Sequence, residues 1–179
     1  MLFFFKLFII VRDLVYLLLL PLLKFNRSFI FCLLLLLQFA ILFNERFILF
    51  SKAVIEAMQR FGWAPDIVHC NDWQTGLIPL FIKDNYNWDK MFDKTATVFT
   101  IHNIGYQGRF SKSTLFAAEI RGELYYPNGP VEFENSVSFM KAGIAFADII
   151  NTVSNKYSHE ILTEEYGAGL HKALLTRKE

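Results

Sequence analysis

The stretch DIVHCNDWQTG, Asp66–Gly76, decides the fold of this chain. A short apolar run, Ile67 and Val68, leads into a cluster of polar and aromatic residues, and the apolar helical pattern Leu77–Ile82 follows. That order predicts a buried parallel strand, a loop at its carboxyl end and a helix that returns across the sheet. Because ligands of open α/β sheets bind at the carboxyl ends of the strands, this loop is the first place to look for chemistry.

A second strand and loop of the same kind lies in TATVFTIHNIGYQG, Thr95–Gly108. Residues 97–101 are rich in strand-forming side chains, and His102 and Asn103 stand where that strand should end. Asp and Asn side chains hydrogen-bond to hydroxyl groups, and a Trp ring can cover the apolar face of a pyranose. The residue types of the first loop, Asp66–Gly76, therefore favour a sugar as the ligand.

The remaining segments complete an α/β pattern. A third strand is predicted at Asp148–Val153, and strands that alternate with helices indicate a parallel sheet. Helices are predicted at 44–61, 77–85, 114–120, 135–147 and 156–164, with Ser154 or Asn155 as the cap of the last one and a loop at 122–134. The predicted fold class is α/β, with a Rossmann-like parallel sheet.

Composition sets outer limits on function. The chain has 179 residues and a net charge of +1, so its charge indicates no nucleic-acid partner. Cys32 and Cys70 are too few for a disulfide framework, which favours a reducing compartment. His69 and Cys70 are adjacent on one strand and should point to opposite faces, so no metal site is predicted there.

Four blocks of sequence in the same order resemble the bacterial glycogen synthase and plant starch synthase family. They are HCNDWQTGLIPLF, TVFTIHNIGYQGRF, FMKAGIAFADIINTVS and EEYGAGL. The resemblance runs from about Asn44 to the end of the chain. A single HN or DW pair would carry no information, but the ordered blocks together are specific.

The resemblance implies a retaining glucosyltransferase of glycogen or starch biosynthesis. Such enzymes transfer glucose from ADP-glucose to the non-reducing end of an α-1,4-glucan, and they use no metal or cofactor besides that donor. Two Rossmann-like domains face a cleft in the GT-B arrangement. Residues 44–179 would form part of the N-terminal catalytic domain, and the family implies a cytoplasmic location.

The same resemblance assigns roles to individual residues. His102 and Asp72 match positions beside the reacting sugars and are the predicted catalytic residues. The predicted substrate-binding residues are Asn103, Trp73, Gln74 and Tyr106. From the residues alone, three alternatives stay open: His102 bonds to a nearby carbonyl, Asp72 caps the following helix, and Tyr106 and Gln107 serve loop packing. Lys141 is expected to be a solvated lysine on a helix, and the glycines of 166–170 form no phosphate loop.

Residues 1–43 are almost entirely apolar and form a separate segment. Ser28–Phe43 is a candidate membrane helix, somewhat shorter than the ~20 residues that span a bilayer. A buried structural segment is disfavoured, because no periodicity organises its faces. The favoured interpretation is out-of-frame or truncated sequence, because the Lys-x-Gly-Gly loop with which the family normally begins is not there.

These observations leave competing functions. The leading prediction is a glycogen or starch synthase fragment that is inactive alone, because it lacks the family's donor-phosphate-binding parts. The alternative is a membrane-tethered, non-catalytic glucan-binding module, membrane-associated through 28–43. A nucleotide-dependent oxidoreductase is disfavoured, because no G-x-G-x-x-G motif follows any predicted strand.

Overall fold

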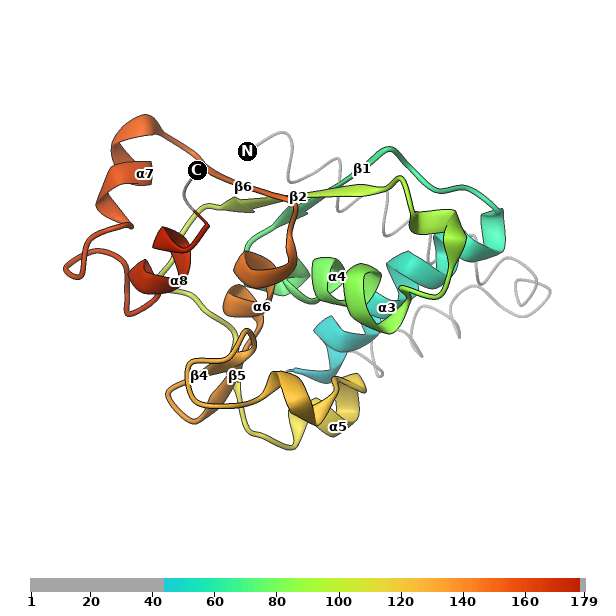
Figure 1. Ribbon diagram of the computed structural model, residues 1–179, viewed down its shortest axis with the longest axis horizontal. Helices are drawn as coiled ribbons and strands as arrows, with labels where there is room; N and C mark the ends of the chain where they lie inside the picture. The colour runs from blue at the N-terminus through green and yellow to red at the C-terminus, as the bar shows by residue number, and fades with distance from the viewer. Residues whose placement is uncertain (1–43, 178–179) are drawn as a thin grey trace, which may run out of the picture.

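A three-stranded parallel sheet lies against a layer of helices in the computed structural model, which describes residues 44–177 (Figure 1). Its strands, in the order β1-β2-β6, are β1 (Ile67–Asn71), β2 (Ala96–Ile101) and β6 (Ile149–Thr152). Cys70 pairs in register with Phe99, and Phe99 with Ile150. All three predicted strands and the parallel α/β class are confirmed.

The helices follow the predicted periodicity in most places. They are α3 (Glu45–Phe61), α4 (Leu77–Leu80), which continues as a π-helical turn (Phe81–Asn85), α5 (Thr114–Ala118), α6 (Phe139–Phe146), α7 (Asn155–Glu160) and α8 (His171–Leu175). Short 3₁₀ turns lie at Trp73–Thr75, Lys90–Phe92 and Gly122–Leu124. Ser154 caps α7 by accepting a hydrogen bond from the Tyr157 N–H at 3.1 Å, so the predicted cap is confirmed, although the helix ends earlier than expected.

The core lies between the sheet and the helices α3, α4 and α6. The strands contribute Cys70, Phe99 and Ile101, and the helices contribute Ile55, Leu80, Phe81, Met140 and Ile144, all of them fully buried. Gly143 allows α6 to lie directly on the sheet, because a Cβ there would come within 2.5 Å of the Phe99 ring. This close approach fixes the position of α6 relative to β2.

A small antiparallel sheet was not predicted. Its strands, in the order β3-β5-β4, are β3 (Arg109–Phe110), β4 (Glu132–Phe133) and β5 (Ser136–Ser138). The helix predicted to begin at residue 135 therefore begins only at Phe139, because residues 136–138 are paired with β3 and β4. The loop predicted at 122–134 likewise contains β4. Such short strands leave little periodicity in the sequence.

Two further expectations are wrong. Strand β1 is not buried on both faces, since the Ile67 side chain is 59% exposed and His69 is also exposed. The side chains of a strand alternate between faces, and only the inner face of this sheet is covered within the described residues. Lys141 is not solvated either: it is 8% exposed, and its Nζ donates to the Glu132 main-chain oxygen at 2.7 Å.

No helix within residues 44–177 has the length and apolar character needed to cross a membrane. The candidate membrane segment Ser28–Phe43 and the rest of residues 1–43 lie outside the described residues.

Asp148 joins the amino ends of β2 and β6 to the helical layer. Its Oδ2 accepts hydrogen bonds from the Thr97 N–H at 2.7 Å and the Thr97 hydroxyl at 2.9 Å, and its Oδ1 pairs with Lys83 Nζ at 2.8 Å. Partial burial by itself would raise the pKa of Asp148. The bonds from Lys83 and Thr97 together outweigh this effect, and the net result is a lowered pKa. The ionised carboxylate therefore stabilises the fold.

Replacing Gly143 tests the contact between α6 and β2. Gly143→Ala places a Cβ against the Phe99 ring, and we expect the free energy of unfolding to fall by about 1–3 kcal/mol through overpacking. Urea denaturation of the full chain measures this. Gly122→Ala is the control, because a Cβ there meets no atom within 4 Å. Equal stability of the two variants would show that α6 does not depend on this contact.

The stability contributed by Asp148 should depend on pH with a defined sign. Its folded pKa lies below the unfolded value, so its contribution is present above the unfolded pKa and is lost as pH falls through the folded pKa. We expect Asp148→Asn to have a lower urea midpoint than the parent at neutral pH. The two should converge between about pH 5 and pH 2. Asp93→Asn, which changes an exposed carboxylate, is the control. A difference in urea midpoint between D148N and the parent that stays constant at every pH would contradict the prediction.

Candidate active site

The carboxyl ends of β1 and β2 bring the two predicted loops together. The strands are parallel neighbours, with Asn71 in register with Thr100, and the Asp72 N–H donates to the Thr100 main-chain oxygen at 2.9 Å. The first residue beyond β1 is thereby joined to the neighbouring strand. Asp72 and His102 consequently occupy the same edge of the sheet.

The Asp72 carboxylate binds the second loop directly. Its Oδ1 accepts hydrogen bonds from the main-chain N–H groups of His102 at 2.8 Å and of Asn103 at 3.4 Å. It accepts no bond from the turn that follows it, so the alternative in which Asp72 caps the next helix is wrong. The carboxylate instead determines where His102 and Asn103 lie.

The backbone of Asp72 adopts a conformation that residues other than glycine rarely take. Its φ is 56° and its ψ −178°. The Thr75 hydroxyl holds this turn by hydrogen bonds to the main chain on both sides: it accepts from the Asn71 N–H at 2.6 Å and approaches the Asn71 and Asp72 carbonyl oxygens at 2.8 and 3.2 Å. Backbone conformations of this kind cost about 1–3 kcal/mol and occur preferentially at functional sites.

His102 is exposed, and its ring contacts the other loop. Its Nε2 lies 3.0 Å from Asn71 Oδ1, and because an amide oxygen only accepts, this contact assigns the ring proton to Nε2. His102 therefore interacts with the amide side chain of Asn71, a residue that is not among the predicted site residues. The sequence did carry a signal for Asn71: it follows His69 by two positions, so both side chains project from the same face of the strand.

The loop after His102 is closed by its own side chains. Asn103 Oδ1 accepts from the Gly105 N–H at 2.9 Å, and the Tyr106 ring is 69% exposed. Gln107 is buried, and its Nε2 donates to the Ala168 main-chain oxygen at 2.8 Å, which supports the packing role for this residue. Gln107 thus connects the loop to the glycine-containing segment 166–170.

Trp73 is half-buried in an aromatic cluster. Its ring centroid lies 4.7 Å from that of Phe47 and 5.9 Å from that of Phe110, and Gly108 passes so close that a Cβ would lie 2.2 Å from the indole. Trp73 and Tyr106 also line a pocket of about 430 Å³. Gln74 is half-buried in the turn after Trp73. The indole is therefore held by protein contacts, and a ligand would reach it from the pocket.

His69 and Cys70 point to opposite faces of β1, as predicted: His69 is exposed and Cys70 is buried. Burial raises the pKa of the Cys70 thiol to about 12, against a smaller opposing effect of its hydrogen bond with Thr75. A thiol with such a pKa is protonated and is a poor nucleophile or metal ligand. Within the described part of the chain, no group of three or more His, Cys, Asp or Glu side chains could hold a metal ion.

The fold and this site define a parallel α/β domain with polar loops at the carboxyl edge of its sheet, and comparison with known proteins makes the class specific. The family model described as the starch synthase catalytic domain matches residues 42–176. Glycogen synthase from Desulforudis audaxviator is 52% identical over 133 residues, and that from Thermodesulfovibrio yellowstonii is 47% identical over 135 residues. The chain belongs to the starch synthase catalytic domain family.

A solved structure agrees with this assignment. The catalytic domain of starch synthase IV from Arabidopsis thaliana, bound to ADP and acarbose, superposes with a TM-score of 0.68 at 36% identity. The match covers 74% of this chain and 28% of that one. Likewise, the glycogen synthase matches cover 74% and 75% of this chain but only 26% and 27% of the relatives. The chain thus spans about a quarter of the length of the relatives it matches.

Variants of Asp72 separate its carboxylate from its backbone strain. Asp72→Ala loses the bonds to His102 and Asn103 and keeps the unfavourable φ, whereas Asp72→Gly loses the same bonds but relieves the strain. We therefore expect D72A to be less stable than D72G by about 1–3 kcal/mol in urea denaturation. Amide hydrogen exchange at His102 should accelerate in both variants. Asp72→Asn keeps an acceptor oxygen and should retain much of the protection of the His102 amide from exchange. Equal stability of D72A and D72G in urea would show that the backbone at residue 72 is not strained.

Proposed function

We propose that residues 44–177 form part of the N-terminal Rossmann-like domain of a retaining GT-B glucosyltransferase, which extends an α-1,4-glucan with glucose from ADP-glucose. The observation that carries the proposal is the bond from the Asp72 carboxylate to the His102 and Asn103 amides. It places the imidazole of His102 and the amide of Asn103 at the carboxyl edge of the sheet. Family membership and the starch synthase structure with bound ADP and acarbose support it.

The residues have separable roles in this proposal. His102 and Asn103 contact hydroxyl groups of the transferred glucose. Asp72 acts through them as a positioning residue, because its carboxylate already accepts from two main-chain amides. Trp73, Gln74 and Tyr106 lie next to the sugar site, with Trp73 and Tyr106 reached through the pocket of about 430 Å³.

The reaction also needs groups that bind the departing diphosphate. Its transition state carries positive charge on the sugar ring and negative charge on the leaving group, so cations and amides must surround the phosphates. None of the six predicted site residues (His102, Asp72, Asn103, Trp73, Gln74, Tyr106) is a lysine or arginine. We therefore propose that these residues supply the sugar side of the site, and that the donor phosphates are bound by a part of the family's structure that this chain does not match.

A chimera tests this function. Residues 44–177 replace the matching segment of the Desulforudis audaxviator glycogen synthase, and transfer of labelled glucose from ADP-glucose to glycogen is measured. We expect the chimera to be active and the 179-residue chain alone to be inactive, because the match covers only 26% of the length of the Desulforudis audaxviator enzyme. Transfer by the chain alone would contradict the division of roles, and a folded but inactive chimera would contradict the function.

Within the chimera, His102→Ala should lower kcat/KM by about tenfold to 100-fold, the loss expected for a hydrogen bond to a reacting sugar. His159→Ala is the matched control, because His159 is exposed on α7 and, among the described residues, its ring bonds to Asn155 and Ser158 of its own helix. Equal effects of the two substitutions would remove His102 from the sugar site.

A further inference from the structure

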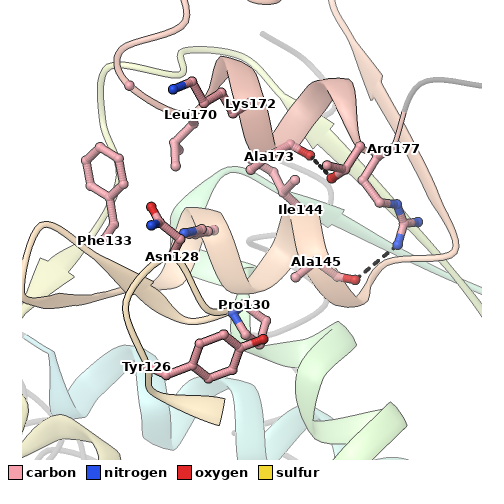
Figure 2. Close-up of a pocket in the computed structure, with 13 residues that line it drawn as sticks. Tyr126, Asn128, Pro130, Phe133, Ile144, Ala145, Leu170, Lys172, Ala173 and Arg177 are labelled. Carbon is pink, nitrogen blue, oxygen red and sulfur yellow. Dashed lines mark hydrogen bonds between the residues drawn. The ribbon is translucent and has the colours of Figure 1, made fainter.

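A second pocket lies between α6, α8 and the loop that leads into β4 (Figure 2). Its volume is about 530 Å³, within the range of pockets that bind small molecules. None of the residues assigned to the candidate active site lines it. The proposed glucosyltransferase function leaves this pocket without a role.

The charged side chains that line this pocket are all cationic. They are Lys141, Lys172 and Arg177, and within residues 44–177 no carboxylate lines the pocket. Arg177 stabilises the fold: its guanidinium donates hydrogen bonds to the main-chain oxygens of Ala145 and Ala147 at the end of α6. Lys141 and Lys172 are the cations that a ligand could engage.

Lys141 is a buried ammonium group with unused hydrogen-bonding capacity. It is 8% exposed, and of its three N–H donors one bonds to the Glu132 main-chain oxygen, the single hydrogen bond of this group among the described residues. The nearby Glu132 carboxylate accepts from the N–H groups of Asn128 and Asn135 instead. Burial lowers the pKa of Lys141 more than the charge of Glu132 raises it, so an anion in the pocket would stabilise the charged lysine.

The rest of the lining fits the body of a small organic molecule. Apolar contacts come from Phe133, Ile144 and Leu170, and the Asn128 side chain adds a polar group between Phe133 and α6 in Figure 2. Lys172 extends along the rim on the side of Phe133 and Leu170. The pocket therefore combines apolar walls with ammonium groups in its lining.

We propose that this pocket binds a phosphate monoester carried on a compact ring, with the phosphate at Lys141 and Lys172 and the ring against Phe133, Ile144 and Leu170. A phosphate monoester carries a charge of about −1.5 to −2 at neutral pH, which two ammonium groups balance. Lysine binds phosphate as a point charge and does not require the fixed fork of an arginine. The ring is that of a sugar or of a nucleoside, and the Asn128 side chain hydrogen-bonds to its hydroxyl groups.

Calorimetric titration of the full chain with glucose 6-phosphate and with AMP tests the proposal, and the tighter ligand identifies the ring. We expect saturable binding that Lys172→Met and Lys141→Met each weaken by about tenfold, the loss of one charge-assisted hydrogen bond. Lys94→Met, on an exposed lysine that does not line the pocket, is the matched control and should bind as the parent does. Lys172 is exposed, so K172M keeps the test valid if the buried K141M fails to fold.

Four results would overturn the proposal. One is no saturable binding of either compound, and another is unchanged affinity in K172M. The third is equal affinity for glucose 6-phosphate and unphosphorylated glucose, which would remove the phosphate from the interaction. Inorganic phosphate serves as the comparison for the ring: binding as tight as that of glucose 6-phosphate would contradict the role of the apolar walls.

Discussion

The candidate site depends on one carboxylate that bridges two loops. Asp72 follows β1 and bonds through its side chain to the amides of His102 and Asn103, which follow β2. To reach them, its backbone takes a φ of 56°, and the Thr75 hydroxyl holds the turn. These hydrogen bonds offset the local strain, and they hold the two loops in one fixed arrangement. The proposed glucosyl transfer would benefit from such fixed polar groups, because preorganised groups lose little free energy in rearranging during a reaction.

The helices supply the rigidity on which this bridge relies. Gly143 brings α6 onto Phe99, and Gly76, at the start of α4, passes so close to α6 that a Cβ would lie 2.0 Å from the Phe139 main-chain oxygen. The aromatic cluster of Trp73, Phe110 and Phe139 then connects the first loop to β3 and α6. A change of helix position would therefore be transmitted to the turn that holds Asp72.

The chain carries two kinds of polar site with different chemistry. The loops at the sheet edge present an imidazole, amides and an exposed tyrosine, which are groups able to hydrogen-bond to hydroxyls. The pocket beside α6 and α8 presents ammonium groups over apolar walls. Lys141 links that pocket to the small antiparallel sheet through its bond to the Glu132 main chain. Burial of this lysine is costly unless a partner compensates it, which is the physical reason to look for an anion there.

The sequence by itself determined the strands at 67–71, 96–101 and 149–152, most helices and the family, because buried apolar runs, capping residues and ordered motifs are local signals. It also located Asp72 and His102 at strand ends. Only the tertiary structure showed that Asp72 bonds to the second loop, that Asn71 contacts His102, that Trp73 is held in a cluster, and that Lys141 is buried. The small antiparallel sheet also escaped prediction, because its strands are two or three residues long. These features arise from contacts between residues distant in the chain, and periodicity along a sequence does not encode which side chains meet across a fold.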